Sequence, residues 1–423
     1  MAAALSYSAD WTLWGGPQRD FRVHASDRLA DSWPAGGPPK LWERKLGEGY
    51  SAIAVRGDTL YTMYRQNAAA WQIFSRDQEV VAALDTATGR TKWEFAYEVN
   101  FRSDQGSGPH VMPQIAGDLI FTVGATGKLH ALNTTTGELV WKRDLYAELG
   151  GTRAAFGYSS HPLPYGDKLI IVAGGKGRAV AAFDQKSGRI AWAALSFRNA
   201  YSSPVLIRAG DRDQVVVLSA QQILGVDPHD GKVLWSRLTG TDPGMAFCST
   251  PVWDAANRIL VFSGAYGVGS TALRITTAGS QTTVEHLWRN NKLQSLFSNL
   301  LLTGNTMYLS RGYHGPSFLT AVDIRTGETR WSARGFANAN FLQADRKLII
   351  LDEDGWLTIA RPNPDGSLEI LSRAPVLSRN AWTIPTLAGT TLYVRDRKVI
   401  MALNVGANHT QPRRVATQTS HVH

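Results

Sequence analysis

The sequence predicts an all-β chain folded as a single eight-bladed β-propeller of four-stranded blades, with its ring closed by an N-terminal strand. Three observations predict this fold. A short phrase containing Asp or Asn, Gly and Trp recurs along the chain, its copies follow a propeller-like period, and the two ends carry complementary parts of one blade. A length of 423 residues would otherwise suggest two or three domains.

The repeated phrase places Gly four residues after an Asp or Asn, and Trp four residues after that Gly. Its full copies are Asp85, Gly89 and Trp93; Asn133, Gly137 and Trp141; Asp184, Gly188 and Trp192; Asp227, Gly231 and Trp235; and Asp323, Gly327 and Trp331. Asp and Asn cap tight turns through nearby backbone amides, and Gly supplies a positive φ. Each copy therefore predicts a hairpin turn followed by an outer strand that carries Trp.

Seven of the 14 tryptophans follow this period and are expected to fasten neighbouring blades. They are Trp42, Trp93, Trp141, Trp192, Trp235, Trp288 and Trp331. The segment around Trp288 keeps its strand but lacks the Asp–Gly turn, and residues 364–371 supply a degenerate seventh unit. We expect each ring to stack near the Gly-containing turn of the next blade, burying about 150–250 Å².

The remaining strands and the domain boundaries follow from the same units. Inner strands start after Gly-Asp pairs such as Gly57-Asp58 and Gly117-Asp118. After Trp382 only three strands remain, whereas residues 40–44 form an orphan fourth strand, so the N-terminal strand should complete the last blade. Closure would remove exposed sheet edges. We therefore expect an arm over 1–39 wrapping the outside or underside, the propeller over 40–405, and a polar, disordered tail over 406–423.

Composition excludes several classes of protein. The lone cysteine, Cys248, rules out a disulfide framework, a cysteine zinc cluster and a vicinal disulfide. The formal charge is +9, but the charges are scattered, so no nucleic-acid partner is predicted. No apolar run approaches the roughly 20 residues of a membrane span. The start, 1–5, is too short for an intact secretion signal, so an exported protein would have lost its leader.

The repeat resembles the pyrroloquinoline-quinone (PQQ) type, whose tryptophan-docking motif reads A-x-D-x-x-T-G-x-x-x-W. The segments 83–93 and 321–331 match it closely, and the resemblance covers about 40–405. It implies the propeller fold and two kinds of function. One is that of quinoprotein dehydrogenases, and the other is that of non-catalytic propellers similar to the outer-membrane assembly protein BamB.

A quinoprotein dehydrogenase needs basic residues for the quinone carboxylates, oxygen ligands for a cation such as calcium, and a catalytic Asp. The resemblance also implies a vicinal disulfide against the cofactor, which one cysteine cannot form. The acidic run 352–354 could bind a cation, but it lacks a companion liganding Glu. No metal site and no cofactor are predicted, and PQQ with calcium stays an alternative.

The candidate ligand-binding residues precede the first strands of blades, where propeller ligands bind near the central axis. They are Arg102, Arg153, His161, Arg198, Asn199, Tyr201, Asn299, Arg379, Asn380 and Trp382. The phrase Arg-Asn-Ala-aromatic occurs at 198–201 and 379–382, on predicted blades four and eight, opposite each other. Two guanidiniums flanked by amides could hold an anionic, planar or sugar-like ligand. The alternative interpretation is structural, with Asn capping the strand and Arg covering the propeller face.

We therefore predict an extracytoplasmic binding or scaffold propeller of the BamB-like type, which captures a ligand or partner at the channel-mouth loops. The expected partner is a protein or a small polar or anionic ligand, and the protein should be a monomer. A periplasmic or extracytoplasmic location is expected, with a cytoplasmic one left open. The alternative is an enzyme with its active site in the central funnel. It would be either a PQQ-dependent oxidoreductase or a cofactor-independent enzyme acting on a carbohydrate or polar metabolite, and no catalytic residue is assigned.

Overall fold

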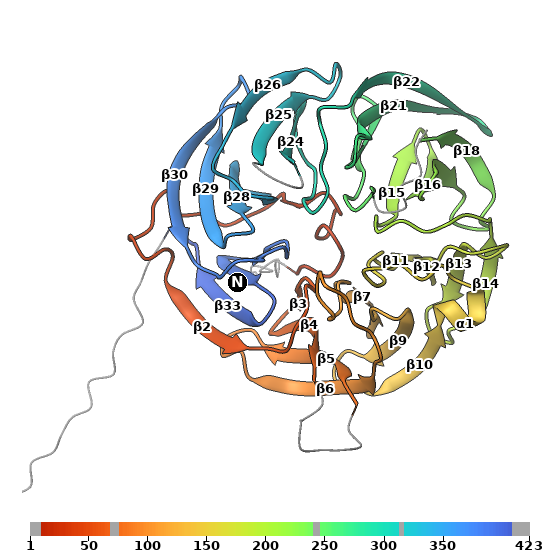
Figure 1. The fold of residues 1–423 in the computed structure, drawn as a ribbon, viewed down its shortest axis with the longest axis horizontal. Helices are drawn as coiled ribbons and strands as arrows, with labels where there is room; N and C mark the ends of the chain where they lie inside the picture. The colour runs from red at the N-terminus through yellow and green to blue at the C-terminus, as the bar shows by residue number, and fades with distance from the viewer. Residues whose placement is uncertain (1–9, 68–75, 240–245, 313–316, 408–423) are drawn as a thin grey trace, which may run out of the picture.

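Eight β-sheets stand around a central axis in the computed structural model, which describes residues 10–67, 76–239, 246–312 and 317–407 (Figure 1). Seven sheets have four strands, and the sheet of blade 7 carries a fifth. The predicted eight-bladed propeller of four-stranded blades is thus confirmed. Within each blade neighbouring strands are antiparallel, so short hairpins make every connection inside a unit.

Blades 1 to 4 follow one another along the chain. Blade 1 consists of β3 (Ala54–Arg56), β4 (Thr59–Gln66), β5 (Gln78–Asp85) and β6 (Thr91–Glu98). Blade 2 consists of β7 (Gln114–Ala116), β8 (Leu119–Val123), β9 (Lys128–Asn133) and β10 (Leu139–Asp144). Blade 3 consists of β11 (Leu163–Tyr165), β12 (Lys168–Val172), β13 (Val180–Asp184) and β14 (Ile190–Ala194). Blade 4 consists of β15 (Val205–Ala209), β16 (Arg212–Leu218), β17 (Gln222–Val226) and β18 (Val233–Leu238).

Blades 5 to 8 complete the circle. Blade 5 consists of β19 (Val252–Asp254), β20 (Ile259–Gly264), β21 (Gly269–Ala278) and β22 (Gln281–Asn290). Blade 6 consists of β23 (Leu301–Thr303), β24 (Thr306–Arg311), β25 (Phe318–Asp323) and β26 (Thr329–Ala333). Blade 7 consists of β27 (Asn340–Ala344), β28 (Lys347–Leu351), β29 (Trp356–Pro362) and β30 (Leu368–Pro375), joined by β1 (Arg22–Val23). Blade 8 consists of β31 (Thr386–Ala388), β32 (Thr391–Arg395), β33 (Val399–Asn404) and β2 (Lys40–Lys45).

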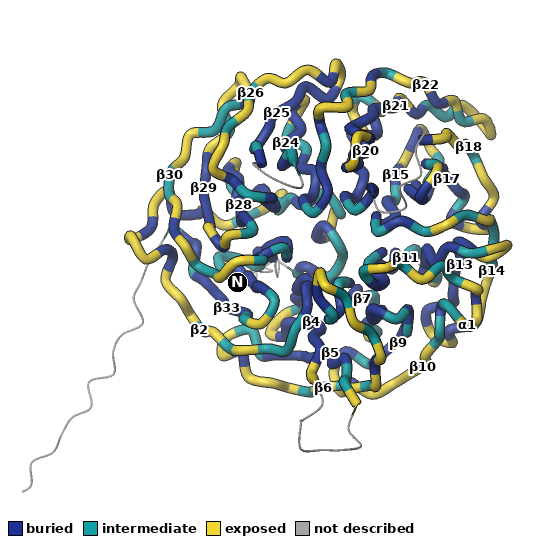
Figure 2. The backbone as a smooth tube through the Cα atoms, viewed as in Figure 1, coloured by how far each residue is buried: buried dark blue, intermediate teal, exposed yellow. Residues whose placement is uncertain are grey.

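Burial follows the position of a strand in its blade. The second and third strands are covered on both faces by neighbouring blades, and β28 is buried along its whole length. Outer strands such as β6 alternate between exposed and half-buried residues, because one face meets solvent (Figure 2). The core is therefore distributed between the blades.

The N-terminal strand closes the ring. Strand β2 pairs antiparallel with β33, from Lys40 opposite Leu403 to Lys45 opposite Val399. The two ends of the described chain therefore share one sheet, and the predicted closure by an N-terminal strand is confirmed. Joining the ends inside a blade makes the last blade's stability depend on both ends of the fold.

Five tryptophans dock on the next blade as the motif predicts. Trp93 is typical: its Nε1 donates to the carbonyl oxygen of Thr134 at 3.0 Å, and its ring covers Gly137 of blade 2. The same arrangement joins Trp42 to Gly89, Trp141 to Gly188, Trp192 to Gly231 and Trp288 to Gly327. A β-bulge lies beside each of these tryptophans.

Two of the seven expected fasteners behave differently. The Nε1 of Trp235 donates to Gln214 Oε1 of its own blade at 2.7 Å, because blade 5 has a long β21–β22 hairpin in place of the Asp–Gly turn. At blade 7 the Gly366 carbonyl accepts instead from the Tyr308 hydroxyl at 3.2 Å. Trp235 and Trp331 therefore do not dock on a Gly-containing turn as predicted, because the turn of the next blade is altered. Each still packs in the hydrophobic core that its blade shares with the next, as expected of a fastener.

The N-terminal arm crosses the underside of the channel. Trp11 forms a backbone bridge to Val55 of blade 1, and the carbonyl of Thr12 accepts from Ile115 of blade 2. The chain then reaches blade 7, where β1 pairs in parallel with the innermost strand β27. Figure 1 shows this dark red segment running across the middle of the ring. The sequence led us to expect the arm on the outside or underside of the ring, and a strand inside the channel was not predicted.

The rest of the described chain adds little to this plan. Helix α1 (Leu145–Leu149) follows blade 2, with Asp144 as its N-cap. Within the described ranges, no helix is long and apolar enough to cross a membrane. Leu29 bridges Gly406, which ties the arm to the end of blade 8. Residues 408–423 lie outside the described residues, so the disordered tail stays a prediction.

Candidate functional site

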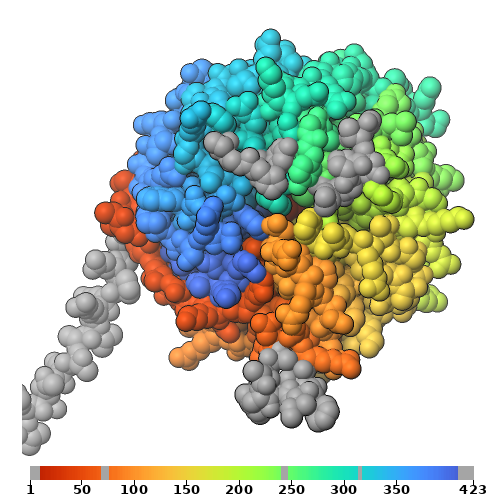
Figure 3. All heavy atoms as spheres, viewed as in Figure 1, coloured from red at the N-terminus to blue at the C-terminus, as the bar shows by residue number. Residues whose placement is uncertain are grey.

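A cavity of about 1130 Å³ opens on the face where the first strand of each blade begins. Its wall is built from segments that precede these strands, such as the one holding Tyr50 before β3 and the one holding Trp382 before β31. Figure 3 shows the hollow near the middle of this face, between blades of different colours. The volume matches or slightly exceeds that of typical small-molecule sites, roughly 300–1,000 Å³.

Trp14 of the N-terminal arm forms the floor of this cavity. Its ring stacks on His161 with the centroids 3.8 Å apart and the planes 12° apart, and it meets Phe21 edge-on. Its Nε1 donates to Thr250 Oγ1 at 2.9 Å, and its backbone N–H donates to Gln114 Oε1 at 2.8 Å. Trp14 also borders a second cavity of only about 20 Å³ on the same axis. The arm thus turns an open channel into a cup.

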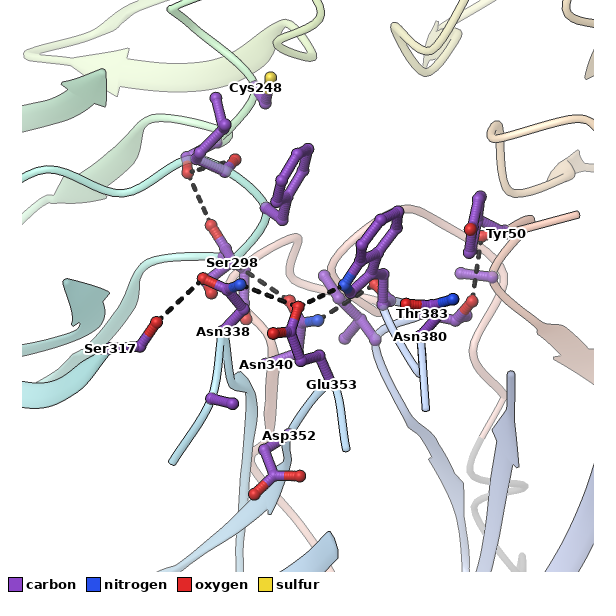
Figure 4. A pocket seen from close by; sticks show the side chains of 18 of the residues that line it. Tyr50, Cys248, Ser298, Ser317, Asn338, Asn340, Asp352, Glu353, Asn380 and Thr383 are labelled. Carbon is purple, nitrogen blue, oxygen red and sulfur yellow. Dashed lines mark hydrogen bonds between the residues drawn. The ribbon is translucent and has the colours of Figure 1, made fainter. Parts of the chain in front are cut away.

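Glu353 organises one side of the cavity (Figure 4). Its Oε2 accepts from the Asn338 amide and from the Trp382 indole N–H, each at 2.8 Å. Its backbone also pairs with both neighbouring segments, at Ala337 and Ala381. This single loop residue therefore links blade 7 to blade 8 and fixes the Trp382 ring in the wall.

The two acids beside Glu353 are held by arginines. Asp352 is buried and pairs with Arg373 at 3.0 Å, while its other oxygen accepts from the Trp356 amide. Burial raises the pKa of Asp352 to about 6, although Arg373 opposes that rise. Asp354 pairs with Arg379 at 3.4 Å. The acidic run predicted from the sequence is therefore an ion-paired wall of the cavity.

Buried neutral groups line the opposite side. His161 Nδ1 lies 2.7 Å from Ser203 Oγ, and burial lowers the pKa of His161 to about 3. Burial likewise lowers the pKa of His110 to about 4. The same effect raises the pKa of the Cys248 thiol to about 12, so Cys248 is an unreactive thiol at neutral pH. Both imidazoles are uncharged near pH 7.

Six of the ten residues predicted for the site line this cavity. They are His161, Tyr201, Asn299, Arg379, Asn380 and Trp382. Tyr201 contributes its hydroxyl as an acceptor for the Phe156 amide, and Asn299 is buried and bonded to Phe341 of the next blade. Both asparagines therefore also support the fold: Asn299 through these bonds between blades, and Asn380 through its positive φ of 69°, which few other residues adopt readily.

The other four predicted residues lie outside the lining. Arg102 is exposed and pairs with Asp77, Arg153 lies over the Tyr146 ring, and Asn199 donates to the Val172 carbonyl. The Arg198 carbonyl accepts from Ala220. The two Arg-Asn-Ala phrases do lie on blades 4 and 8, but Arg379 lines the cavity and Arg198 does not. They do not form a facing pair of guanidiniums in its wall.

Sequence reasoning missed the residues that shape the cup. Trp14 gave no signal, because it lies outside the repeat. Tyr50 and Phe297 lie in loops and Trp356 begins β29, places where the repeat imposes no pattern, so only their position at or before a strand could have indicated them. The Glu353–Trp382 contact joins two blades and cannot be read from spacing.

A quinone–calcium centre does not fit the residues of this cavity. Of its three acids, Asp352 and Asp354 are paired with arginines, and Glu353 bonds two N–H donors through one oxygen. A search of the described ranges finds no group of three His, Cys, Asp or Glu placed to hold a metal ion. Calcium takes six to eight oxygen ligands, which the ion-paired wall does not present.

Comparison of the sequence with family models matches more than half of the chain to one family. The family described as outer membrane protein assembly factor BamB matches over residues 76–333. The BamB protein of Yersinia pestis is 23% identical over 352 residues, covering 77% of this chain and 82% of that protein. A polyvinylalcohol dehydrogenase of a Sphingopyxis species is 21% identical over 308 residues, covering 69% of this chain and 41% of that protein.

Solved structures share the fold. BamB from Moraxella catarrhalis superposes with a TM-score of 0.59 at 18% identity, covering 89% of this chain and all of that one. The quinohemoprotein alcohol dehydrogenase from Comamonas testosteroni has a TM-score of 0.67 at 13% identity, covering 96% of this chain and 82% of that one. At such identities the likeness concerns the propeller fold.

Proposed function

Because the chain belongs to the BamB family of PQQ-repeat propellers, we propose that it is a periplasmic binding or scaffold protein that captures its ligand or partner in the central cavity. One observation carries this proposal: the N-terminal arm closes one end of the channel, so the cavity opens to one face only. Function on a propeller resides in loops held by a rigid frame.

The surroundings of the cavity support binding. Trp382 is fixed from three sides, by Glu353 on its N–H, by Phe297 stacked at 5.0 Å and by Tyr50 at 5.1 Å. A ring held in this way loses little entropy when a ligand arrives, and such preorganisation favours affinity. The pairing of Asp352 and Asp354 with arginines keeps their charges compensated before any ligand enters.

Site-specific photocrosslinking tests the proposal. A photoreactive phenylalanine analogue at Phe156, on the cavity wall, should capture a ligand or partner in cells that express the protein. The matched control is Leu238 on the outer strand β18, whose exposed fraction is 83%. Adducts formed from Leu238 and absent from Phe156 would contradict the proposal. Cell fractionation of the same strain tests the periplasmic location.

An enzyme acting in the same cavity is the second candidate, and one observation favours it. Asp352 lines the cavity with a pKa raised by burial to about 6, a value suited to proton transfer near neutral pH. Turnover of a small molecule that is lost in Asp352→Asn, with binding retained, would support catalysis over capture alone.

A further inference from the structure

Aromatic rings from all eight blades line the cavity, and we define a girdle by one ring from each blade. The aromatic girdle, in blade order, consists of Tyr50, His110, Phe156, Tyr201, Tyr266, Phe297, Trp356 and Trp382. Part of it is continuous, since Phe297 stacks on Trp382, Trp382 contacts Tyr50, and Tyr50 lies 5.6 Å from His110. A ligand in the cavity therefore lies among aromatic side chains contributed by every blade.

Trp356 is the best-placed platform in the girdle. The Arg373 guanidinium lies between two rings, 5.1 Å from the Trp356 centroid and 5.0 Å from that of Phe336. Arg373 also bonds Asp352 and the Gly335 carbonyl, so the support beneath the indole is rigid. The exposed fraction of Trp356 is nevertheless 38%, which leaves ring surface available to a ligand.

Formal charges on the cavity wall balance. The lining holds three acids, Asp352, Glu353 and Asp354, and three bases, Arg334, Arg373 and Arg379. Two acid–arginine pairs are formed already, and both lining histidines are neutral at pH 7. An anion or a cation would unbalance this wall at a desolvation cost, whereas a neutral hydroxyl can donate to a paired carboxylate and accept from its arginine.

Two deeply buried side chains of the lining each have one polar atom that bonds no residue among those the structure describes. Tyr50 has an exposed fraction of 7% and His161 one of 6%. The two atoms are the Tyr50 hydroxyl and His161 Nε2. Both atoms have almost no accessible surface, so a ligand in the cavity does not reach them and they are not counted among its contacts.

We propose that the cavity binds a neutral, polyhydroxylated ligand, namely an oligosaccharide without net charge. Apolar C–H faces of sugar rings would stack on Trp356 and other girdle rings, as large aromatic surfaces allow. Sugar hydroxyls would bond Arg373 and the Asp354–Arg379 pair, whose side chains keep exposed surface on the lining. The volume of about 1130 Å³ accommodates more than one ring. This inference rests on the proposed function and specifies its ligand class.

Calorimetric titration with defined oligosaccharides tests the inference. The neutral probes are maltohexaose, cellohexaose and chitohexaose, and the charged probes are tetragalacturonate and the fully deacetylated chitosan hexamer. We expect at least one neutral hexasaccharide to bind, and neither charged oligomer to bind more tightly. Trp356→Ala should weaken that binding at least tenfold, whereas the outer-wall control Leu238→Ala should leave it unchanged.

Three outcomes separate the two proposals. Binding of a charged oligomer alone, lost in Trp356→Ala, would overturn the neutral-saccharide inference and leave the cavity as a binding site. Cavity adducts at Phe156 with no oligosaccharide binding would do the same. Neutral binding that Trp356→Ala and Trp382→Phe both leave intact would overturn the assignment to the cavity. Circular dichroism of each variant confirms that the blades remain folded.

Discussion

Replacing Gly137 by Ala should destabilise the propeller far more than replacing Gly117, although both glycines lie in turns of blade 2 with positive φ. A Cβ on Gly137 would lie 2.6 Å from Cδ2 and Cε3 of Trp93, whereas a Cβ on Gly117 would have no neighbour within 4 Å. Their φ angles are 75° and 56°, so the backbone strain is similar in the two variants. The difference between them therefore isolates the docking of Trp93.

The magnitudes follow from the contacts. Left-handed backbone costs an L-residue about 1–2 kcal/mol, which is the whole expected loss for Gly117→Ala. Gly137→Ala adds overpacking against the indole, about 1–3 kcal/mol, and weakens the Trp93 Nε1 bond to the Thr134 carbonyl, about 1 kcal/mol. We therefore expect a total loss of about 3–6 kcal/mol for Gly137→Ala.

Urea unfolding, followed by both circular dichroism and tryptophan fluorescence, measures the two losses, with coincident transitions justifying a two-state treatment. A double-mutant cycle with Trp93→Leu should remove the excess cost of Gly137→Ala, because the clashing ring is gone. Equal free energies of unfolding for Gly137→Ala and Gly117→Ala would refute the docking argument. So would an excess cost of Gly137→Ala that persists when Trp93→Leu is also present.

The remaining predictions concern the cavity. Trp14→Ala should lower the free energy of unfolding by about 3 kcal/mol, and Trp14→Phe by only about 1 kcal/mol. The Phe variant loses less because Phe can still stack on His161, although it cannot donate to Thr250. Urea unfolding midpoints of the two variants measure this difference. His161 has a lowered pKa, so its contribution to stability is full above its ordinary pKa of 6.5 and is lost as pH falls toward 3. Between pH 7.5 and pH 5 the free energy of unfolding of the wild type should therefore fall by about 2 kcal/mol more than that of His161→Asn. Urea unfolding at both pH values measures the two decreases, and equal decreases would contradict the prediction. Asp352 has the opposite sign, because its raised pKa stabilises the fold at low pH and this contribution is lost as pH rises through about 6. Between pH 4.5 and pH 7 the free energy of unfolding of the wild type should fall by about 2 kcal/mol relative to that of Asp352→Asn. A difference between the two proteins that does not change with pH would contradict a raised pKa for Asp352.

The sequence was sufficient for the ring because the fold repeats a local rule. An Asp or Asn with a Gly four residues later specifies a turn that receives the tryptophan of the preceding blade, as Gly137 receives Trp93. The rule fails where the receiving turn is altered, which is why Trp235 bonds within its own blade. The sequence of the receiving turn thus predicts whether the tryptophan of the preceding blade docks on it.

The site was predictable only in part, for a physical reason. Residues before first strands converge on the axis by topology, so His161, Tyr201 and Trp382 could be expected near one cavity. Whether a side chain points inward depends on loop geometry that has no period, and Arg198 lies outside the lining for that reason. Trp14 reaches the floor through contacts 100 and 236 residues away along the chain, which no spacing encodes.

Crystals grown with a neutral hexasaccharide that binds in titration would test the central claim most directly. The account predicts sugar density inside the cup above Trp14, with a sugar ring against Trp356 and hydroxyls bonded to Arg373 and to the Asp354–Arg379 pair. Sugar bound to the outer wall of the ring, with none in the cavity, would contradict it.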